Sequence, residues 1–170
     1  NASLGEMIST LKKEGIKVPN GFATSASAYW NFIEENNLKE KIEQQLKKFE
    51  SKEQSLEKTG KQIRRFILHS DFPEQLEKDI KDSYQKLCEE YKKDEVDVAV
   101  RSSATSEDLP EASFAGQQET FLNITGVNEL LESCRKSYAS LFTDRAISYR
   151  NEKGFDHMKV ALSIGIQKMV

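Results

Sequence analysis

The feature that most constrains the fold is a long charge-rich stretch, residues 38–93, in which apolar residues recur at helical spacing. The heptad repeat is not sustained, so the pattern predicts two or three amphipathic helices with one packed face and one solvated face, and not a coiled coil. Pro73 suits a first helical turn, where its missing N–H is harmless. The apolar positions of this stretch are Leu38, Ile42, Leu46, Phe49, Ile63, Phe66, Ile67, Leu76, Ile80, Tyr84 and Leu87.

Shorter elements flank this stretch, and the character of the chain changes at Val96, where β-branched alternation begins. We expect an α+β fold, in which the helical layer of residues 38–93 packs on a small, mainly antiparallel sheet within one domain spanning 1–170. The other predicted elements are helices at 3–13, 25–35, 127–141 and 146–150, an extended segment at 18–22, strands at 96–100, 118–124 and 160–170, and a loop at 102–117.

Composition excludes several classes of protein. The 170 residues carry 25 basic and 28 acidic side chains mixed along the chain, a net charge of −3, so a nucleic-acid duplex is not an expected partner. No segment resembles a signal peptide or a membrane span, so we expect a cytoplasmic protein with no membrane partner. Cys88 and Cys134 are far apart and lie in helix-like segments, which predicts buried thiols and neither a disulfide framework nor a metal site.

The most unusual segment begins where Arg101 ends an apolar strand. Five hydroxyl residues and Gly116 follow it, and together they could bring donors close to an anion, with the arginine as a rigid fork for phosphate oxygens. An exposed serine-rich turn with Arg101 paired to Glu107 or Asp108 explains the same residues equally well. Physical reasoning alone leaves a phosphate site and a solvated turn open.

Residues 100–123 read VRSSATSEDLPEASFAGQQETFLN, and this string closely resembles the nucleotide-binding domain of the phosphoenolpyruvate synthase and pyruvate phosphate dikinase family, which the rifampicin phosphotransferases share. Residues 1–38 and 141–170 resemble the beginning and a later part of the same domain, whereas residues 50–90 match only in character. The last string, ending VALSIGIQKMV, is more similar to the synthases than to the rifampicin phosphotransferases. The resemblance implies the first subdomain of an ATP-grasp domain.

The resemblance also implies roles for particular residues. Arg101 would contact phosphate and neutralise charge during transfer, so it is the expected catalytic residue, while Gly116 and Thr120 would line the triphosphate pocket. Gln167, Met169 and Val170 would lie on a strand beside adenine, with backbone groups at the base edge. A phosphate-binding lysine that family members carry just before the position of Asn1 is absent from this sequence.

ATP and Mg²⁺ are the implied cofactors, and the acidic metal ligands are expected in a second subdomain beyond Val170, so no metal ligand is assigned within this chain. Glu107, Asp108 and Glu111 are expected to be solvated loop acids. His69 and His157 fall outside the family's histidine motif and are expected on a helix surface and in a loop.

For the intact enzyme, the resemblance implies conversion of ATP, pyruvate and water to phosphoenolpyruvate, AMP and phosphate through a phosphohistidine on a swivelling domain. Pyruvate would bind in another absent domain, so the chain alone is expected to be inactive. Two alternatives stand beside this interpretation. One is the ATP-binding domain of a rifampicin phosphotransferase, and the other is a non-catalytic interaction module that works through residues 38–93.

Overall fold

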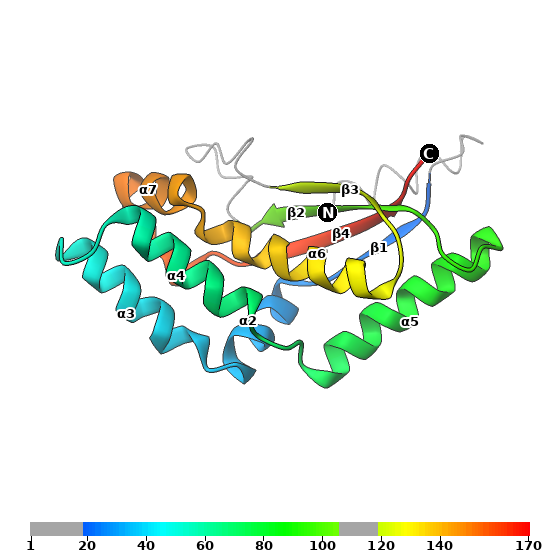
Figure 1. The fold of residues 1–170 in the computed structure, drawn as a ribbon, viewed down its shortest axis with the longest axis horizontal. Coiled ribbons are helices and arrows are strands. Elements are labelled where there is room, and N and C mark those ends of the chain that lie inside the picture. The colour runs from blue at the N-terminus through cyan, green and yellow to red at the C-terminus, as the bar shows by residue number, and fades with distance from the viewer. Residues whose placement is uncertain (1–18, 106–118) are drawn as a thin grey trace.

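The computed structural model describes residues 19–105 and 119–170. The helix predicted at 3–13, Gly116 and most of the loop predicted at 102–117 lie outside these residues. The remaining chain forms a helical layer packed on one small sheet (Figure 1). The predicted α+β class is therefore confirmed.

The sheet has four strands in the order β1-β4-β2-β3, and every neighbouring pair is antiparallel. The last strand of the chain is thus central, between the first strand and the second. Strand β4 is paired on both edges and buried on one face, so its residues alternate between buried apolar side chains and small or polar ones. The strands are β1 (Gly21–Ala23), β2 (Val98–Ala104), β3 (Thr120–Ile124) and β4 (Leu162–Lys168).

Strand β2 is longer than the sequence predicted. The expected loop beginning at Ser102 is wrong for its first residues, because Ser102, Ser103 and Ala104 continue the strand opposite Ile164, Ser163 and Leu162 of β4. Serines have little intrinsic preference for strands, and pairing with a central strand overrides that preference. Arg101 is consequently inside a strand, and not at its end.

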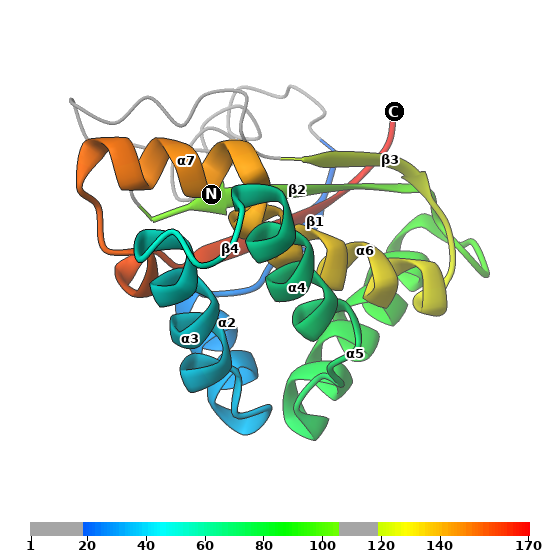
Figure 2. The ribbon, with the colours of Figure 1, turned by 60° about the vertical axis from the view of Figure 1, so that its left-hand side comes forward.

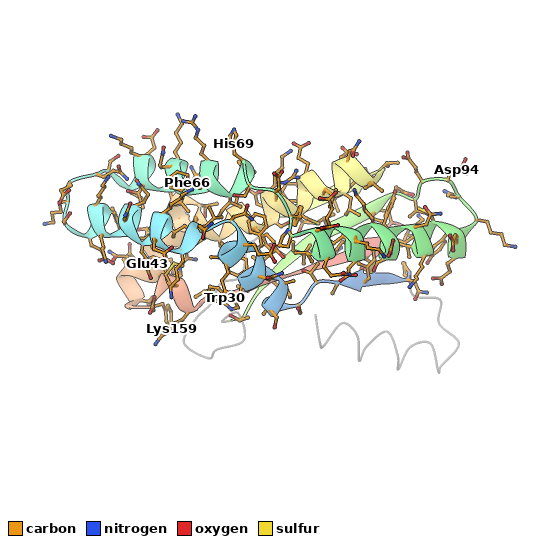
Figure 3. The ribbon with its side chains drawn as sticks, turned by 90° about the horizontal axis from the view of Figure 1, so that it is seen from below. Trp30, Glu43, Phe66, His69, Asp94 and Lys159 are labelled. Carbon is orange, nitrogen blue, oxygen red and sulfur yellow. The ribbon has the colours of Figure 1, made fainter. Side chains whose placement is uncertain are left out.

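Most of the helices cover one face of the sheet, below it in Figures 1 and 2, and the helix Asp144–Lys153 lies beside one end of the sheet. Residues 38–93 form three helices, as predicted, and their outward faces are rich in charged side chains (Figure 3). Helix α6 lies directly against β2 and β3, and α4 packs on α6. The helices are α2 (Ala26–Glu35), α3 (Leu38–Glu50), α4 (Leu56–Leu68), α5 (Glu74–Tyr91), α6 (Val127–Ala139) and α7 (Asp144–Lys153).

Short polar side chains begin several of these helices. Ser25, Ser55 and Thr143 each accept a hydrogen bond from the amide three residues ahead, which satisfies one of the free N–H groups of the first turn. Pro73 occupies the capping position just before α5, one residue earlier than the predicted first turn. It still stands where no helical hydrogen bond from its nitrogen is required.

The core is built around four aromatic rings from distant parts of the chain. Tyr29 and Phe32 of α2 meet Tyr138 of α6 with ring centroids 5.2 and 5.1 Å apart, and Phe72 lies 5.4 Å from Phe32. Tilted and edge-on arrangements at these separations are the favourable ones for aromatic pairs. This cluster joins the first helix to the helix beneath the sheet. The structure also confirms that both cysteines are buried free thiols.

Candidate functional site

A row of residues crosses the sheet at Arg101. Thr120 of β3 lies opposite Arg101 on one side, and Gly165 of β4 lies opposite it on the other, with Ala23 of β1 beyond Gly165. Residues that pair directly across strands point to the same face of a sheet. Arg101 and Thr120 are both exposed, whereas their neighbours Val98 and Val100 point into the core. The row therefore lies on the face opposite the helices.

Gln167 belongs to the same face. It follows Gly165 by two residues on β4 and pairs with Ala99 of β2. Strand geometry places its Cα about 8 Å from that of Arg101. The structure thus brings Arg101, Thr120 and Gln167 together, although their positions in the sequence are widely separated.

The floor between these three side chains is made of small residues. Ala99, Gly165 and Ala23 offer a methyl group or no side chain at all on this face. A sheet surface with such residues lets a flat or extended ligand approach the backbone closely. The positive charge of Arg101 at one part of this floor and the amide of Gln167 at another suit a ligand with an anionic part and a neutral polar part.

Arg101 has no ion pair among the residues that the structure describes. The alternative partners considered above, Glu107 and Asp108, lie outside those residues. The exposed guanidinium of Arg101, without an ion pair among the described residues, can bind an anion from solvent.

The hydroxyl residues after Arg101 do not all serve an anion. The Ser102 hydroxyl donates to the carbonyl of Glu119 at 3.3 Å, and the Thr105 hydroxyl accepts from the amide of Ala161 at 3.1 Å. Both bonds fasten the end of β2 to its neighbours. Two of the five hydroxyl groups are therefore engaged in bonds within the protein. The expectation for Ser106 and Ser113 concerns residues outside those that the structure describes.

The segment after β4 is tied down in a way that the sequence did not indicate. The Met169 amide donates to the carbonyl of Asp97 at 2.9 Å, and the Lys168 ammonium donates to the Asp97 carboxylate at 3.0 Å and to the Met169 carbonyl. Both polar backbone groups of Met169 thus have partners. The Val170 amide has none among the described residues, so it is the available backbone donor at this end of the strand.

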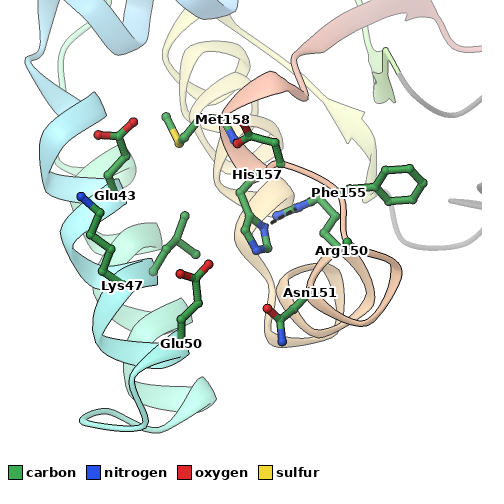
Figure 4. A pocket seen from close by; sticks show the side chains of 11 residues that line it. Glu43, Lys47, Glu50, Arg150, Asn151, Phe155, His157 and Met158 are labelled. Atoms are coloured by element: carbon green, nitrogen blue, oxygen red, sulfur yellow. Dashed lines mark hydrogen bonds between the residues drawn. The ribbon is translucent and has the colours of Figure 1, made fainter.

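A hollow of about 440 Å³ lies between α3, the end of α7 and the turn before β4 (Figure 4). His157 forms part of its wall, and the prediction that this histidine lies in a loop is wrong, because it sits in a 3-10 turn and is only 7% exposed. Its Nδ1 accepts a hydrogen bond from Nε of buried Arg150 at 2.9 Å. Glu43, Lys47 and Glu50 face it from α3, and this mixture of charges does not define one ligand.

His69 follows the carboxyl end of α4 on the surface, as predicted (Figure 3), and its Nδ1 lies 2.9 Å from the Arg65 carbonyl oxygen of that helix. In residues 19–105 and 119–170, no group of three or more His, Cys, Asp or Glu side chains is arranged to hold a metal ion. None of the described helices is long and apolar enough to cross a membrane.

Fold and site together define an α+β domain whose sheet carries, on the face opposite the helices, an arginine and polar side chains beside small residues. The whole chain, residues 1–170, matches the model of the pyruvate phosphate dikinase AMP/ATP-binding domain, and the chain belongs to that family.

The similar proteins include three phosphoenolpyruvate synthases. Those of Aquifex aeolicus, Synechocystis and Escherichia coli are 52%, 53% and 48% identical to this chain, and each alignment covers all of it. The aligned region makes up 20% of the first of these proteins and 21% of the other two. The chain therefore spans about one fifth of the length of these relatives.

Proposed function

We propose that this chain is the ATP-binding part of a phosphoenolpyruvate synthase, a cytoplasmic enzyme that converts ATP, pyruvate and water to phosphoenolpyruvate, AMP and phosphate. The observation that carries the proposal is the placement of Arg101, Thr120 and Gln167 on the sheet face opposite the helices. Family membership and identities near one half to named synthases support it.

In this proposal the triphosphate lies over Arg101 and Thr120. The guanidinium binds phosphate oxygens in a bidentate manner, and the threonine hydroxyl donates to another oxygen. Phosphoryl transfer requires positioning and neutralisation of charge more than covalent participation by the protein, and Arg101 supplies part of that neutralisation. Gly116 would line the same pocket.

The base lies toward Gln167, where β4 ends. The Gln167 amide already donates to the Pro19 carbonyl at 3.3 Å, so its oxygen remains as an acceptor. The Val170 amide has no partner among the described residues, so it is the backbone donor assigned to the base. Met169 contributes its side chain, because its amide and carbonyl are engaged. The resemblance implied that Gln167, Met169 and Val170 meet the base through backbone groups. In this proposal only Val170 does so, and the other two use their side chains.

The remaining steps belong to parts of the enzyme outside this chain. Mg²⁺ would enter with ATP and be held by carboxylates of a second subdomain. A histidine on a swivelling domain would carry the phosphoryl group to pyruvate. This chain would bind and orient the nucleotide, without completing the reaction.

The proposal is tested by titrating the chain with Mg-ATP and following amide chemical shifts. Shifts should cluster at Arg101, Thr120, Gln167 and Val170, and Arg101→Ala should weaken binding by about tenfold or more, since a charge-assisted bidentate contact is lost. Arg65→Ala, which removes an arginine from the helical layer, is the matched control and should leave binding unchanged. If the chain alone gives no shifts, the titration is repeated on a longer chain that includes the flanking regions of the relatives. Silence there as well would overturn the proposal.

Two other functions are separated by further measurements. A rifampicin phosphotransferase would bind the same nucleotide but pass phosphate to the antibiotic, so a full-length chain that consumes ATP with rifampicin and not with pyruvate would favour it. An interaction module acting through α3, α4 and α5 would be indifferent to nucleotide. The charged faces of these helices carry i,i+4 ion pairs such as Lys78–Asp82, which is typical of a solvated surface.

A further inference from the structure

The carboxyl end of β4 is held by a small polar cluster. Lys168 is its centre: the ammonium contacts the Asp97 carboxylate and the Met169 carbonyl, and it lies 5.7 Å from the centre of the Tyr91 ring. The side chain is only 11% exposed. A lysine so enclosed, with an acid, a carbonyl and an aromatic face around its ammonium, is held in one position instead of moving in solvent.

Other bonds join this cluster to the strand edges. The Lys168 amide donates to the Asn20 carbonyl at 2.9 Å, and the Asn20 amide donates to the Tyr91 hydroxyl at 3.0 Å. Tyr91 ends α5, which reaches the same end of the molecule as the end of β4 (Figures 1 and 2). The cluster therefore links the helical layer, the start of β1 and the end of β4.

The consequence for Val170 follows from the geometry of the peptide bond. The peptide that joins Met169 to Val170 is trans, because the described residues contain no cis peptide, so its C=O and N–H point in opposite directions. The Lys168 ammonium donates to the Met169 carbonyl. The Met169 amide, on the preceding peptide, donates to the backbone carbonyl of Asp97. The direction of the unpaired Val170 N–H is thereby fixed, away from the Lys168 ammonium.

We infer that Lys168 and Asp97 are positioning residues for base selection, because they hold the Val170 N–H as a fixed hydrogen-bond donor toward the base edge. This inference rests on the proposed nucleotide site. A fixed donor fits the N1 acceptor of adenine and is repelled by the N1–H donor of guanine. Burying two facing donors costs more than an ordinary missed contact, so the donor discriminates between the bases.

The test compares dissociation constants of the Mg²⁺ complexes of ATP and GTP for the wild type, Lys168→Met, Lys168→Arg and Asp97→Asn, in the longer chain that includes the flanking regions. Lys168→Met should lower the preference for ATP over GTP by about fivefold to tenfold, the size of one hydrogen bond. Lys168→Arg should retain most of the preference for ATP, because an arginine side chain can reach both the Asp97 carboxylate and the Met169 carbonyl. Lys159→Met, at an exposed lysine of the 3-10 turn, is the matched control.

A second readout separates this inference from the proposed function. Residual dipolar couplings report the direction of the Val170 N–H in the chain without nucleotide, and that direction should change in Lys168→Met and return in Lys168→Arg. An unchanged direction, or an unchanged ratio with both nucleotides still bound, overturns the role of Lys168. Failure of the wild-type longer chain to bind either nucleotide overturns the proposed function, and the role in base selection with it.

Discussion

Arg150 and His157 form a buried pair in which the arginine Nε donates to the histidine Nδ1 at 2.9 Å. Arg150 also donates to the Leu141 carbonyl, and its guanidinium lies 5.4 Å from the Phe142 ring. The arginine thus joins α7, the 3-10 turn Ser140–Phe142 that follows α6 and the turn that leads into β4. Because Nδ1 accepts the bond, the imidazole must be neutral with its proton on Nε2.

The first prediction is a loss of stability in acid. Burial, followed by the charge of Arg150, lowers the pKa of His157 from 6.5 to about 4. Between these values the unfolded state binds more protons than the folded state, so the free energy of unfolding falls as pH falls from 6.5 toward 4, and is unaffected by this group above 6.5. The loss should reach about 3 kcal/mol. Urea unfolding measured at pH 7 and pH 4.5 checks it.

Acidic groups also contribute to acid denaturation, so a control is needed. His157→Asn keeps an acceptor for the arginine and does not titrate. The difference in pH dependence between wild type and this variant gives the contribution of His157 alone. It removes the contributions of groups such as Asp82 and Glu132, whose pKa values are lowered by hydrogen bonds from Lys78 and Lys136. Equal pH dependence in the two proteins would refute the prediction.

Two tyrosine-to-phenylalanine substitutions should have different effects. The Tyr84 hydroxyl donates to the Val96 carbonyl at 2.8 Å and accepts from the Gly126 amide at 3.0 Å, and both bonds are buried. Removing it leaves two buried backbone groups without partners, so Tyr84→Phe should cost about 2–3 kcal/mol. Thermal and chemical unfolding measure the cost.

Tyr29→Phe is the matched comparison. The Tyr29 hydroxyl is fully buried with no hydrogen-bond partner among the described residues, and burial raises its pKa. Since an unpaired buried hydroxyl is unfavourable, its removal should leave stability unchanged or raise it by about 1 kcal/mol. A large loss of stability in Tyr29→Phe would mean that the hydroxyl has a partner, such as an internal water.

Gly60 lies where α4 packs closely against Asp144, the first residue of α7, and a substitution at Gly60 tests this packing. A Cβ at this position would lie 2.3 Å from Asp144 Oδ1 and 2.6 Å from Arg64 Nη1, two atoms that form an ion pair at 2.9 Å. Gly60→Ala should therefore displace these two flexible side-chain ends and destabilise the protein by up to about 1 kcal/mol, despite the better helix propensity of alanine. Unfolding in denaturant measures this change.

A double-mutant cycle supplies the control for Gly60. In the Asp144→Ala background the nearest clashing atom is gone, so Gly60→Ala should cost less than in the wild type and approach the gain expected from helix propensity. Additive effects of the two substitutions would contradict the steric explanation.

Gly21 tests the edge of the sheet. A Cβ there would lie 2.1 Å from the Ile166 carbonyl oxygen, so only glycine lets β1 approach β4 this closely. Gly21→Ala should detach β1 and speed amide exchange at Thr24, whose N–H bonds to the Ile164 carbonyl, while exchange in β2 stays slow. Ala23→Gly, on the same strand, lowers β propensity without adding a Cβ, and it shows how far exchange at Thr24 responds to propensity alone. Unchanged exchange in Gly21→Ala would refute this packing role.

The sequence by itself determined the helices and the fold class. Apolar residues at helical spacing placed α3, α4 and α5, and the helix predicted at 25–35 corresponds to α2, because such periodicity is a local property of the chain. The string around Arg101 indicated a phosphate site through family resemblance, while its physical pattern left a solvated turn open.

Only the tertiary structure decided how those elements form a surface. Pairing of β4 between β1 and β2 extended β2 through Ala104 and set Arg101 opposite Thr120, which are 19 residues apart in the chain. The burial of Arg150 against His157 and the enclosure of Lys168 by Asp97 also depend on contacts between distant segments. Such contacts leave no periodic signal in the sequence, because strand register and side-chain pairing are set by the complete sheet and its helical layer.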